Sequence, residues 1–208
     1  MSKRVRILIV DDHSLMRVGL VTLLNLEPDM AVVAQASTGQ QAIDLYRKHR
    51  PDIVLMDLRM PGMSGDEATA RLCEKFPGAK VLALSSYDAQ EQIFRCVQAG
   101  ARSYLPKDVV LDELLRAIRT VHDGQNYLPP AIAARLMERM RAPELSPRED
   151  AVLQLIVKGN TNKKIASALS IAETTVKDHV SNILTKLKAT DRTQASTVAI
   201  QRGLVQLN

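Results

Sequence analysis

The sequence predicts a doubly wound α/β domain in residues 1–123 and a small all-α domain in residues 144–208. Two patterns support this division. Short apolar runs alternate with helical patterns in the first part, as expected for a parallel sheet covered by helices on both faces. Beyond residue 144 only helical patterns remain. A chain of 208 residues, 46% of them apolar, is long enough for two domains with separate cores.

Five short runs are the predicted strands. Several are continuously apolar, which is typical of strands buried on both sides. We predict strands at residues 6–10, 31–36, 53–56, 81–85 and 103–105. The strand order 2-1-3-4-5 is adopted from known doubly wound folds and does not follow from the sequence itself.

Helical segments separate these strands and follow the last one. We predict helices at residues 15–26, 39–49, 65–76, 90–99 and 109–121. The last segment places its apolar residues close to the spacing of one helical face. Those residues are Leu111, Leu114, Leu115, Ile118 and Val121.

Residues 124–143 form the predicted linker, which is rich in turn residues and contains a short predicted helix at 131–140. A four-helix domain follows at 144–208. Ser146, Pro147 and Glu149 give its first helix a clear start, with a capping serine and proline in the first turn. The other three helices are expected near residues 162–169, 173–187 and 191–203.

The charge is distributed unevenly between the two parts. Residues 1–124 contain 16 Lys and Arg against 16 Asp and Glu, whereas residues 125–208 contain 12 against 7. The whole excess of +5 therefore lies in the second part, which is a mild indication of nucleic-acid binding. Cys73 and Cys96 lack metal-binding spacing, and no apolar run is long enough to span a bilayer. These features predict a cytoplasmic protein without a membrane partner.

Acidic residues follow two of the predicted strands. Asp11 and Asp12 come after the first strand and Asp57 after the third, and these strands are neighbours in the expected order. Ligands bind beyond the carboxyl ends of such strands, so the three carboxylates should converge. Clustered carboxylates need a cation, and hard oxygen ligands suit Mg²⁺. Ser85 ends the fourth strand and Lys107 follows the fifth, so both should lie at the same edge of the sheet.

Residues 5–122 resemble the flavodoxin-like receiver domain of bacterial two-component response regulators. The resemblance rests on residues at the strand ends and in the loop after the third strand. They are Asp11-Asp12, Met56-Asp57 with Met60-Pro61-Gly62, Ser85, Tyr104 and Lys107.

The resemblance implies that Asp57 is the phosphoacceptor and that a sensor histidine kinase is the donor. It also implies that Mg²⁺ is bound by Asp12, Asp57, the backbone carbonyl of Arg59 and, through water, Asp11. His13 follows the acidic pair, and we expect it to begin a helix without binding metal, since no second ligand has helical spacing to it.

Ser85, Tyr104 and Lys107 are the switch residues that the resemblance implies. Lys107 should pair with the phosphoryl oxygens, and Ser85 should hydrogen-bond one of them and shift. Tyr104 should then rotate inward to fill the space that Ser85 leaves. A local change of charge and packing would thus bias a two-state element.

A helix-turn-helix is predicted in the second part, where a short helix, a tight turn and a longer helix follow one another. The longer helix has a buried stripe at Val176, Val180, Ile183, Leu184 and Leu187. Its outward residues are Lys177, Asp178, Ser181 and Asn182. Such a helix can enter the major groove of DNA.

Residues 145–204 resemble the LuxR-type helix-turn-helix of NarL/FixJ response regulators, on the motifs Leu145-Ser146-Pro147-Arg148-Glu149, Thr161-Asn162-Lys163-Lys164-Ile165-Ala166 and Thr174-Thr175-Val176-Lys177-Asp178-His179-Val180. The resemblance implies that Lys177 and Ser181 lie in the groove. Phosphate contacts are implied for Thr161, Asn162, Lys163, Thr175, His179 and Lys186. A dimer face is implied on the last helix at Ala195, Val198, Ala199 and Arg202.

Two local features of this domain have more than one interpretation. Ala172 occupies a position where the family often has a capping Ser or Thr, and Ser170 with Glu173 could supply the cap instead. Asp178 could accept a hydrogen bond from cytosine or remain at the edge of the groove.

The sequence therefore predicts a transcription regulator in which phosphorylation of Asp57 releases and dimerises a domain that binds promoter DNA. The alternative is a DNA-binding regulator that works without phosphorylation. A magnesium phosphatase is disfavoured because such enzymes need an acid two residues after the nucleophile, where Arg59 stands. We expect no enzyme beyond weak self-dephosphorylation.

Overall fold

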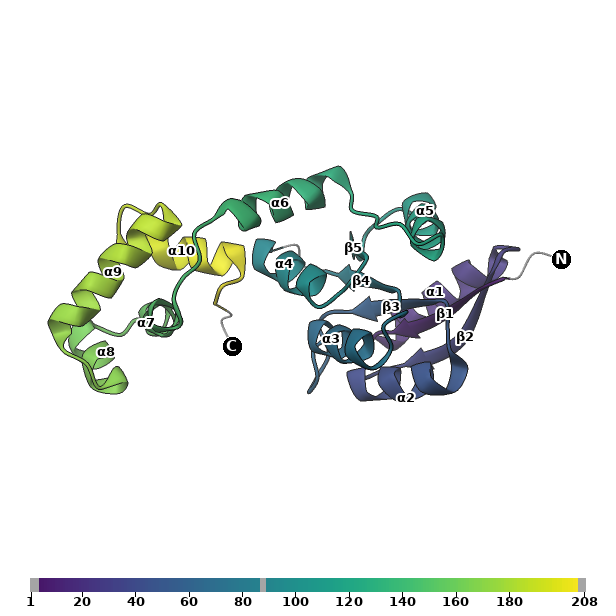
Figure 1. Cartoon of the computed structure of the whole chain (residues 1–208), viewed down its shortest axis with the longest axis horizontal. Helices are drawn as coiled ribbons and strands as arrows, with labels where there is room; N and C mark the ends of the chain where they lie inside the picture. The colour runs from purple at the N-terminus through teal and green to yellow at the C-terminus, as the bar shows by residue number, and fades with distance from the viewer. Residues whose placement is uncertain (1–3, 87–88, 206–208) are drawn as a thin grey trace. The chain divides into compact units, whose positions relative to one another are not determined.

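The computed structural model describes residues 4–86 and 89–205. Its first part contains a five-stranded parallel sheet with the order β2-β1-β3-β4-β5 (Figure 1). The strands are β1 (Val5–Val10), β2 (Met30–Ala36), β3 (Ile53–Asp57), β4 (Val81–Ser85) and β5 (Ser103–Pro106). The predicted strands and their adopted order are confirmed.

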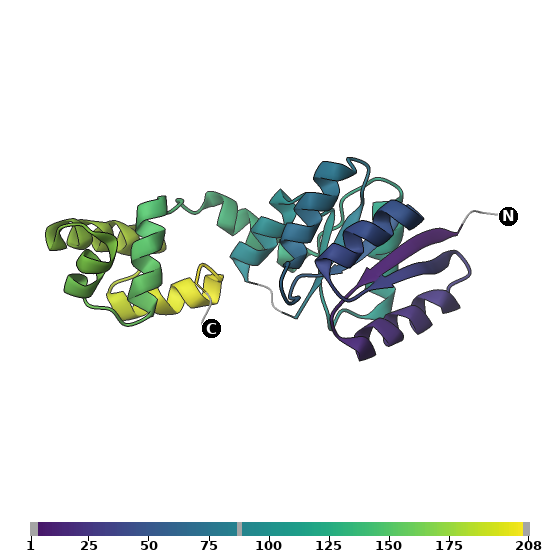
Figure 2. The ribbon, with the colours of Figure 1, turned by 90° about the horizontal axis from the view of Figure 1, so that it is seen from below.

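Five helices cover the two faces of this sheet (Figures 1 and 2). One face packs against α1 (Ser14–Leu26) and α5 (Leu111–His122). The other face packs against α2 (Gly39–His49), α3 (Gly65–Lys75) and α4 (Gln90–Gln98). Strands β1, β3 and β4 are almost completely buried because they lie between these helical layers.

Local signals in the sequence explain where several helices begin. The hydroxyl of Thr38 caps α2 by accepting a hydrogen bond from the backbone N–H of Gln41, and Ser64 caps α3 in the same way with Glu67. Such caps satisfy backbone groups that the first turn of a helix cannot pair internally.

The segment after α5 is more ordered than a turn-rich linker. Tyr127 forms a parallel bridge with Ser103 of β5, and α6 (Pro130–Arg141) follows. Backbone contacts divide the chain into two compact units, and the first one continues through Leu136. Residues Ala89–Gln92 group with the second unit, which otherwise begins at Met137. The first half of α6 thus packs with the sheet because its apolar residues are buried there.

Four helices form the rest of the second unit, namely α7 (Pro147–Val157), α8 (Asn162–Leu169), α9 (Glu173–Leu187) and α10 (Arg192–Arg202). The predicted capping box is present, since Ser146 and Glu149 exchange hydrogen bonds at the start of α7. Ser170 does not cap α9. It ends α8 in a left-handed conformation with φ of 52°, and Ala172 precedes α9 without a side-chain cap.

The apolar residues of these four helices meet in one core. Its fully buried members include Val152, Ile165, Val176 and Ile183. The stripe predicted for the long helix faces this core, so the polar residues between its members face outward. Within the described residues, no helix combines the length and apolar character needed to cross a membrane.

Candidate functional site

Three carboxylates meet at the carboxyl edge of the sheet. Asp11 follows β1 and Asp57 ends β3, and these strands are neighbours in register. Both side chains are about 1% exposed, whereas Asp12 is half-buried. One ligand atom from each of Asp11, Asp12, His13 and Asp57 lies within 4.8 Å of the others. The expected convergence of acidic groups is therefore observed.

Lys107 supplies the positive charge of this cluster. Its Nζ lies 2.7 Å from Asp57 Oδ2 and 2.8 Å from Asp11 Oδ2. The backbone holds it in place, because the Lys107 N–H donates to the carbonyl oxygen of Ser85 at 2.8 Å. One ammonium thus faces two buried carboxylates, and with Asp12 nearby the cluster retains an excess of negative charge.

The buried pair has perturbed protonation equilibria. Burial raises the pKa of Asp57, and hydrogen bonds from Lys107 and the backbone of Arg59 offset this only in part. Burial alone would lower the pKa of Lys107, but its contacts with Asp11 and Asp57 outweigh that effect and raise it. Lys107 therefore stays charged, and the Asp57 carboxylate is more basic than an exposed one.

His13 is the group that the sequence argument set aside. The structure brings its Nδ1 to 2.7 Å from Asp12 Oδ1 and 3.2 Å from Asp11 Oδ1. It also precedes α1 as the N-cap residue, without a side-chain capping bond. Its Nδ1 also lies 3.9 Å from Asp57 Oδ2 at the end of β3, and helical spacing could not reveal this contact because Asp57 is not on the same helix.

Gly65 is a further residue that the sequence argument missed. A Cβ atom at this position would collide with the carbonyl oxygen of Asp57 and the Cα of Leu58. Only glycine therefore allows α3 to start this close to the backbone of Asp57 and Leu58. The sole signal in the sequence is a glycine directly after the capping Ser64, which by itself would not have distinguished it from other turn glycines.

The cluster can hold a hard divalent cation. Asp12 Oδ1 is buried and, among the described residues, accepts no well-aligned hydrogen bond. The His13 ring nitrogen lies 2.7 Å away without the alignment of a hydrogen bond, and a buried carboxylate oxygen in this position is costly unless a cation or water satisfies it. Three carboxylates around one point are the ligand set that Mg²⁺ and similar ions prefer. The residues present therefore fit a metal site.

Two of the expected switch residues lie on the neighbouring strands β4 and β5. Ser85 ends β4 and is about 1% exposed, and Tyr104 lies in β5 opposite Ala83. The Tyr104 side chain is completely buried, in a cluster that includes Leu58 and Ile132 of α6. Any inward movement of this ring would take place inside the core, because α6 already covers it.

In the second unit, the outward face of α9 is polar and exposed. Lys177, Asp178, Ser181 and Asn182 are all exposed. Thr161 caps α8 by accepting a hydrogen bond from the backbone N–H of Lys164. The remaining side chains expected at DNA phosphates are Lys163, which is exposed, and Thr175 and His179, which are half-buried.

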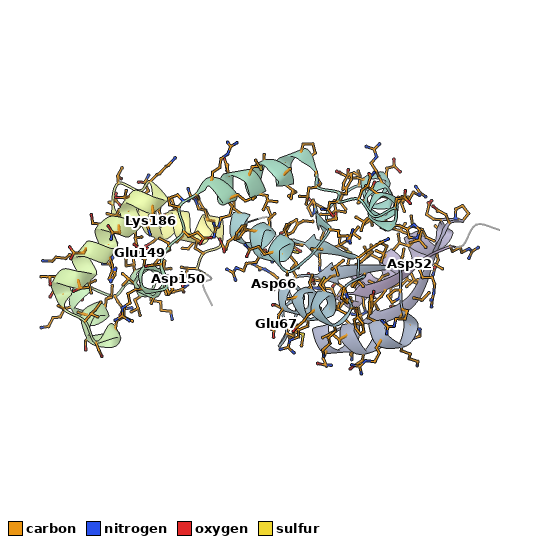
Figure 3. All side chains as sticks on the ribbon, in the orientation of Figure 1. Asp52, Asp66, Glu67, Glu149, Asp150 and Lys186 are labelled. Carbon is orange, nitrogen blue, oxygen red and sulfur yellow. The ribbon has the colours of Figure 1, made fainter. Side chains whose placement is uncertain are left out.

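Lys186 has a structural partner that the sequence argument did not foresee. Its Nζ lies 2.7 Å from Glu149 Oε2 and donates to the carbonyl oxygen of Glu144 at 2.9 Å. Figure 3 labels Lys186 on α9 and Glu149 on α7. The Glu149 side chain is buried and also accepts from the backbone N–H of Ser146. Lys186 thus ties α9 to the start of α7, which competes with a role in holding phosphate.

Asn162 accepts a hydrogen bond inside its own unit, and two alanines of α10 pack in the core of that unit. Arg192 donates to Asn162 Oδ1 at 3.2 Å and to the carbonyl oxygen of Asn160. Ala195 and Ala199 are buried in the core of the helical unit. This burial corrects their assignment to a dimer face, because small side chains on α10 pack inward here. Val198 and Arg202 remain half-exposed.

Comparison with known proteins agrees with this division. Residues 7–119 match the model of the response regulator receiver domain, and residues 143–199 match that of the bacterial regulatory proteins of the luxR family. The transcriptional regulatory protein LiaR of Bacillus subtilis (strain 168) is 38% identical over 209 residues, which cover 97% of this chain and 99% of LiaR.

Two further relatives span both units. The response regulator protein VraR of Staphylococcus aureus (strain Mu3 / ATCC 700698) is 38% identical, with 97% of this chain and 99% of VraR covered. Among solved structures, the response regulator ChrA of a heme-sensing two-component system has 36% identity and a TM-score of 0.58, with 97% of this chain and 98% of ChrA covered.

Proposed function

Because the chain belongs to the two-component response regulators with a LuxR-type DNA-binding domain, we propose that phosphorylation of Asp57 controls its binding to promoter DNA. The observation that carries this proposal is the buried ion pair between Asp57 and Lys107, beside Asp11. The family assignment makes the chain a transcription regulator rather than an enzyme that turns over substrates.

Asp57 is the proposed nucleophile. Its carboxylate oxygen attacks the phosphorus of a phosphohistidine on a partner kinase, and the P–N bond breaks as the P–O bond forms. The leaving imidazole keeps the electron pair and takes a proton. Lys107 Nζ already lies 2.7 Å from Asp57 Oδ2, so it can pair with the new phosphoryl oxygens without a large movement.

Mg²⁺ is the cation that we propose for the acidic cluster. Asp12 and Asp57 would hold it with the backbone carbonyl of Arg59, and Asp11 would contact it through water. When bound, it neutralises negative charge on the transferring phosphoryl group. The backbone of Arg59 is already tied to the cluster, since its N–H donates to Asp57 Oδ1 at 3.1 Å.

For DNA recognition we propose the exposed face of α9. Lys177, Asp178, Ser181 and Asn182 would face base edges in the major groove. Thr161, Lys163, Thr175 and His179 would contact phosphates. Asn162 and Lys186 are weaker candidates for phosphates, because both are engaged within the fold.

The active form is proposed to be a homodimer on paired half-sites in the cytoplasm. Of the four residues expected at the dimer face, Val198 and Arg202 remain partly exposed. Both cysteines of the chain are free thiols, which suits a reducing compartment.

Transfer of labelled phosphate tests the proposed function. The wild-type chain, incubated with acetyl phosphate and Mg²⁺, should take up one phosphoryl group. It should then bind more tightly to the DNA that the phosphorylated chain selects from a pool of sequences, which is the selected DNA of these tests. Asp57→Asn should do neither, because an amide cannot form the acyl phosphate. If Asp57→Asn gains DNA affinity from the donor as wild type does, the switch at Asp57 is wrong. If the wild-type chain takes up no label and binds DNA equally well with and without the donor, the alternative of a phosphorylation-independent regulator is correct.

A further inference from the structure

An arginine from another helix is bound at each end of α8. Arg192, the first residue of α10, donates to Asn162 Oδ1 at 3.2 Å and to the carbonyl oxygen of Asn160. Arg148, in the first turn of α7, donates to the carbonyl oxygen of Leu169 at 2.6 Å. Both arginines are half-buried. One guanidinium therefore holds the start of this short helix, and a second one holds its last residue.

The two arginines meet helix ends of opposite polarity. The carboxyl end of a helix carries partial negative charge, so a cation at the Leu169 carbonyl is favourable. Arg192 lies at the amino end of α10 and contacts the amino end of α8, and both ends carry partial positive charge. Asp191 caps α10, whereas α8 has the uncharged cap Thr161 and no acidic residue in its first turn. An anion that approaches the start of α8 is therefore favoured.

Arg192 fixes the chain on both sides of Thr161. Asn160 precedes Thr161 and Asn162 follows it, and the same guanidinium contacts both. A guanidinium is a planar fork that holds two acceptors in a fixed geometry, which a single ammonium cannot match. The contact thus determines how Thr161 and the exposed Lys163 are presented at the start of α8.

The loop before α8 is also held by α7, independently of Arg192. The backbone N–H and the side-chain amide of Asn160 both donate to the carbonyl oxygen of Leu155, each at 3.1 Å. Asn160 is therefore tied to α7 through its donors and to α10 through its carbonyl oxygen. Removing the Arg192 contacts should leave the end of α7 closed and loosen only the start of α8.

We propose that Arg192 is the positioning residue for the contacts of α8 with DNA phosphates. By clamping the chain around Thr161, it sets the start of α8 so that Thr161 and Lys163 meet the DNA backbone. The inference rests on the proposed function, which places these two residues at phosphates. The competing interpretation is that Arg192 only stabilises the helical unit, as Arg148 does at the other end of α8.

The salt dependence of DNA binding tests this proposal in the full chain. Each phosphate contact made by a lysine adds about one to the slope of log affinity against log salt concentration. Binding is measured by fluorescence anisotropy on the selected DNA and on a scrambled duplex of the same length, with acetyl phosphate and Mg²⁺ present throughout. Arg192→Lys keeps the charge and removes the fork. Arg148→Lys is the matched control, because it changes the same kind of contact at the other end of the same helix.

Arg192→Lys is expected to lower the slope by about one and to weaken binding to both duplexes about tenfold, because phosphate contacts do not depend on sequence. Arg148→Lys should leave the slope unchanged. Lys163→Ala should lower the slope by about one in the wild-type chain. It should have little further effect in the Arg192→Lys background, since the same contact is already lost there. Urea unfolding of each variant measures its stability separately.

Asn162→Ala is a second variant for the case that Arg192→Lys does not fold. It removes one acceptor of the clamp and leaves Arg192 and the Thr161 cap in place. An amide side chain is uncharged and releases no counterions from DNA. A lower slope in Asn162→Ala would therefore report a displaced Lys163 and support the positioning role.

The outcomes separate this inference from the proposed function. If Lys163→Ala lowers the slope but Arg192→Lys and Asn162→Ala do not, the positioning role is wrong while α8 still contacts DNA. An equal change of slope in Arg192→Lys and Arg148→Lys would also overturn it, because the effect would then be a general loosening of α8. If Lys163→Ala itself leaves the slope unchanged, the phosphate contact of the proposed function is wrong and this inference fails with it.

Discussion

The acidic pocket of the first unit and the polar face of α9 differ in how they are assembled. The pocket takes residues 11, 57 and 107 from three strand ends and buries them, so each charge depends on its neighbours. The face of α9 takes its exposed residues from two turns of a single helix. A buried site made by distant segments has perturbed pKa values, whereas the side chains of an exposed site can contact a ligand directly.

Lysines illustrate the difference within one chain. Lys107 is 13% exposed and neutralises two carboxylates, whereas Lys177 is exposed to solvent. Lys186 belongs to the helical unit but resembles Lys107, because it pairs with the buried carboxylate of Glu149. Burial and partners, rather than the domain in which a lysine lies, therefore decide whether it acts on the fold or on a ligand.

The largest effect is expected from Lys107→Met. Without the ammonium, Asp11 and Asp57 remain buried without their counter-ion, and breaking such a pair should reduce the free energy of unfolding by about 3 kcal/mol. Urea unfolding without metal measures this. Added Mg²⁺ should restore part of the loss. Equal stability of variant and wild type would show that the pocket does not depend on this charge.

A smaller effect on the helical unit is expected from Glu149→Gln. The change removes the charge that pairs with Lys186, and loss of a charge-assisted hydrogen bond should cost about 2 kcal/mol. Hydrogen exchange of the α7 amides in the full chain measures it. Asp150→Asn, at the next, exposed position, is the matched control and should change exchange little.

The Glu149 effect also has a defined pH dependence. Burial tends to raise the pKa of Glu149, but hydrogen bonds from Lys186 and Ser146 outweigh it, so the pKa lies below its usual value of 4.5. A carboxyl with a lowered folded pKa stabilises the fold above its unfolded pKa, and this contribution is lost as the pH falls through the folded value. The difference in stability between wild type and Glu149→Gln should therefore be largest at pH 7. It should shrink as the pH falls below the usual pKa of a glutamate. A difference that persists unchanged in acid would contradict the ion pair.

The smallest effect on stability is expected from Lys177→Ala, which should leave the free energy of unfolding unchanged. It should weaken DNA binding by about 1 kcal/mol, the lower end of the range for a side chain that contacts a base edge. Fluorescence anisotropy on the selected DNA measures the affinity at several salt concentrations. Lys158→Ala, an exposed lysine at the end of α7, is the control. An equal loss in both variants would mean that net charge, and not the face of α9, governs binding.

Much of the fold could be predicted because its signals are local. Apolar runs fixed the strands within one or two residues, and Ser146 with Glu149 marked the start of α7. The convergence of Asp11 and Asp57 was predictable once the strand order was adopted. Pairings that depend on packing were not predictable, such as the ion pair of Lys186 with Glu149 and the burial of Ala195 and Ala199 in the helical core.

The sequence by itself determined which segments are strands and helices, and which residue types gather at the strand ends, because periodicity and capping act over a few neighbouring residues. Only the tertiary structure decided that the first half of α6 belongs to the first unit, that His13 lies beside Asp57 and that Gly65 must lack a side chain. These features depend on surfaces meeting from distant parts of the chain, and the free energy of such contacts has no counterpart in local sequence patterns.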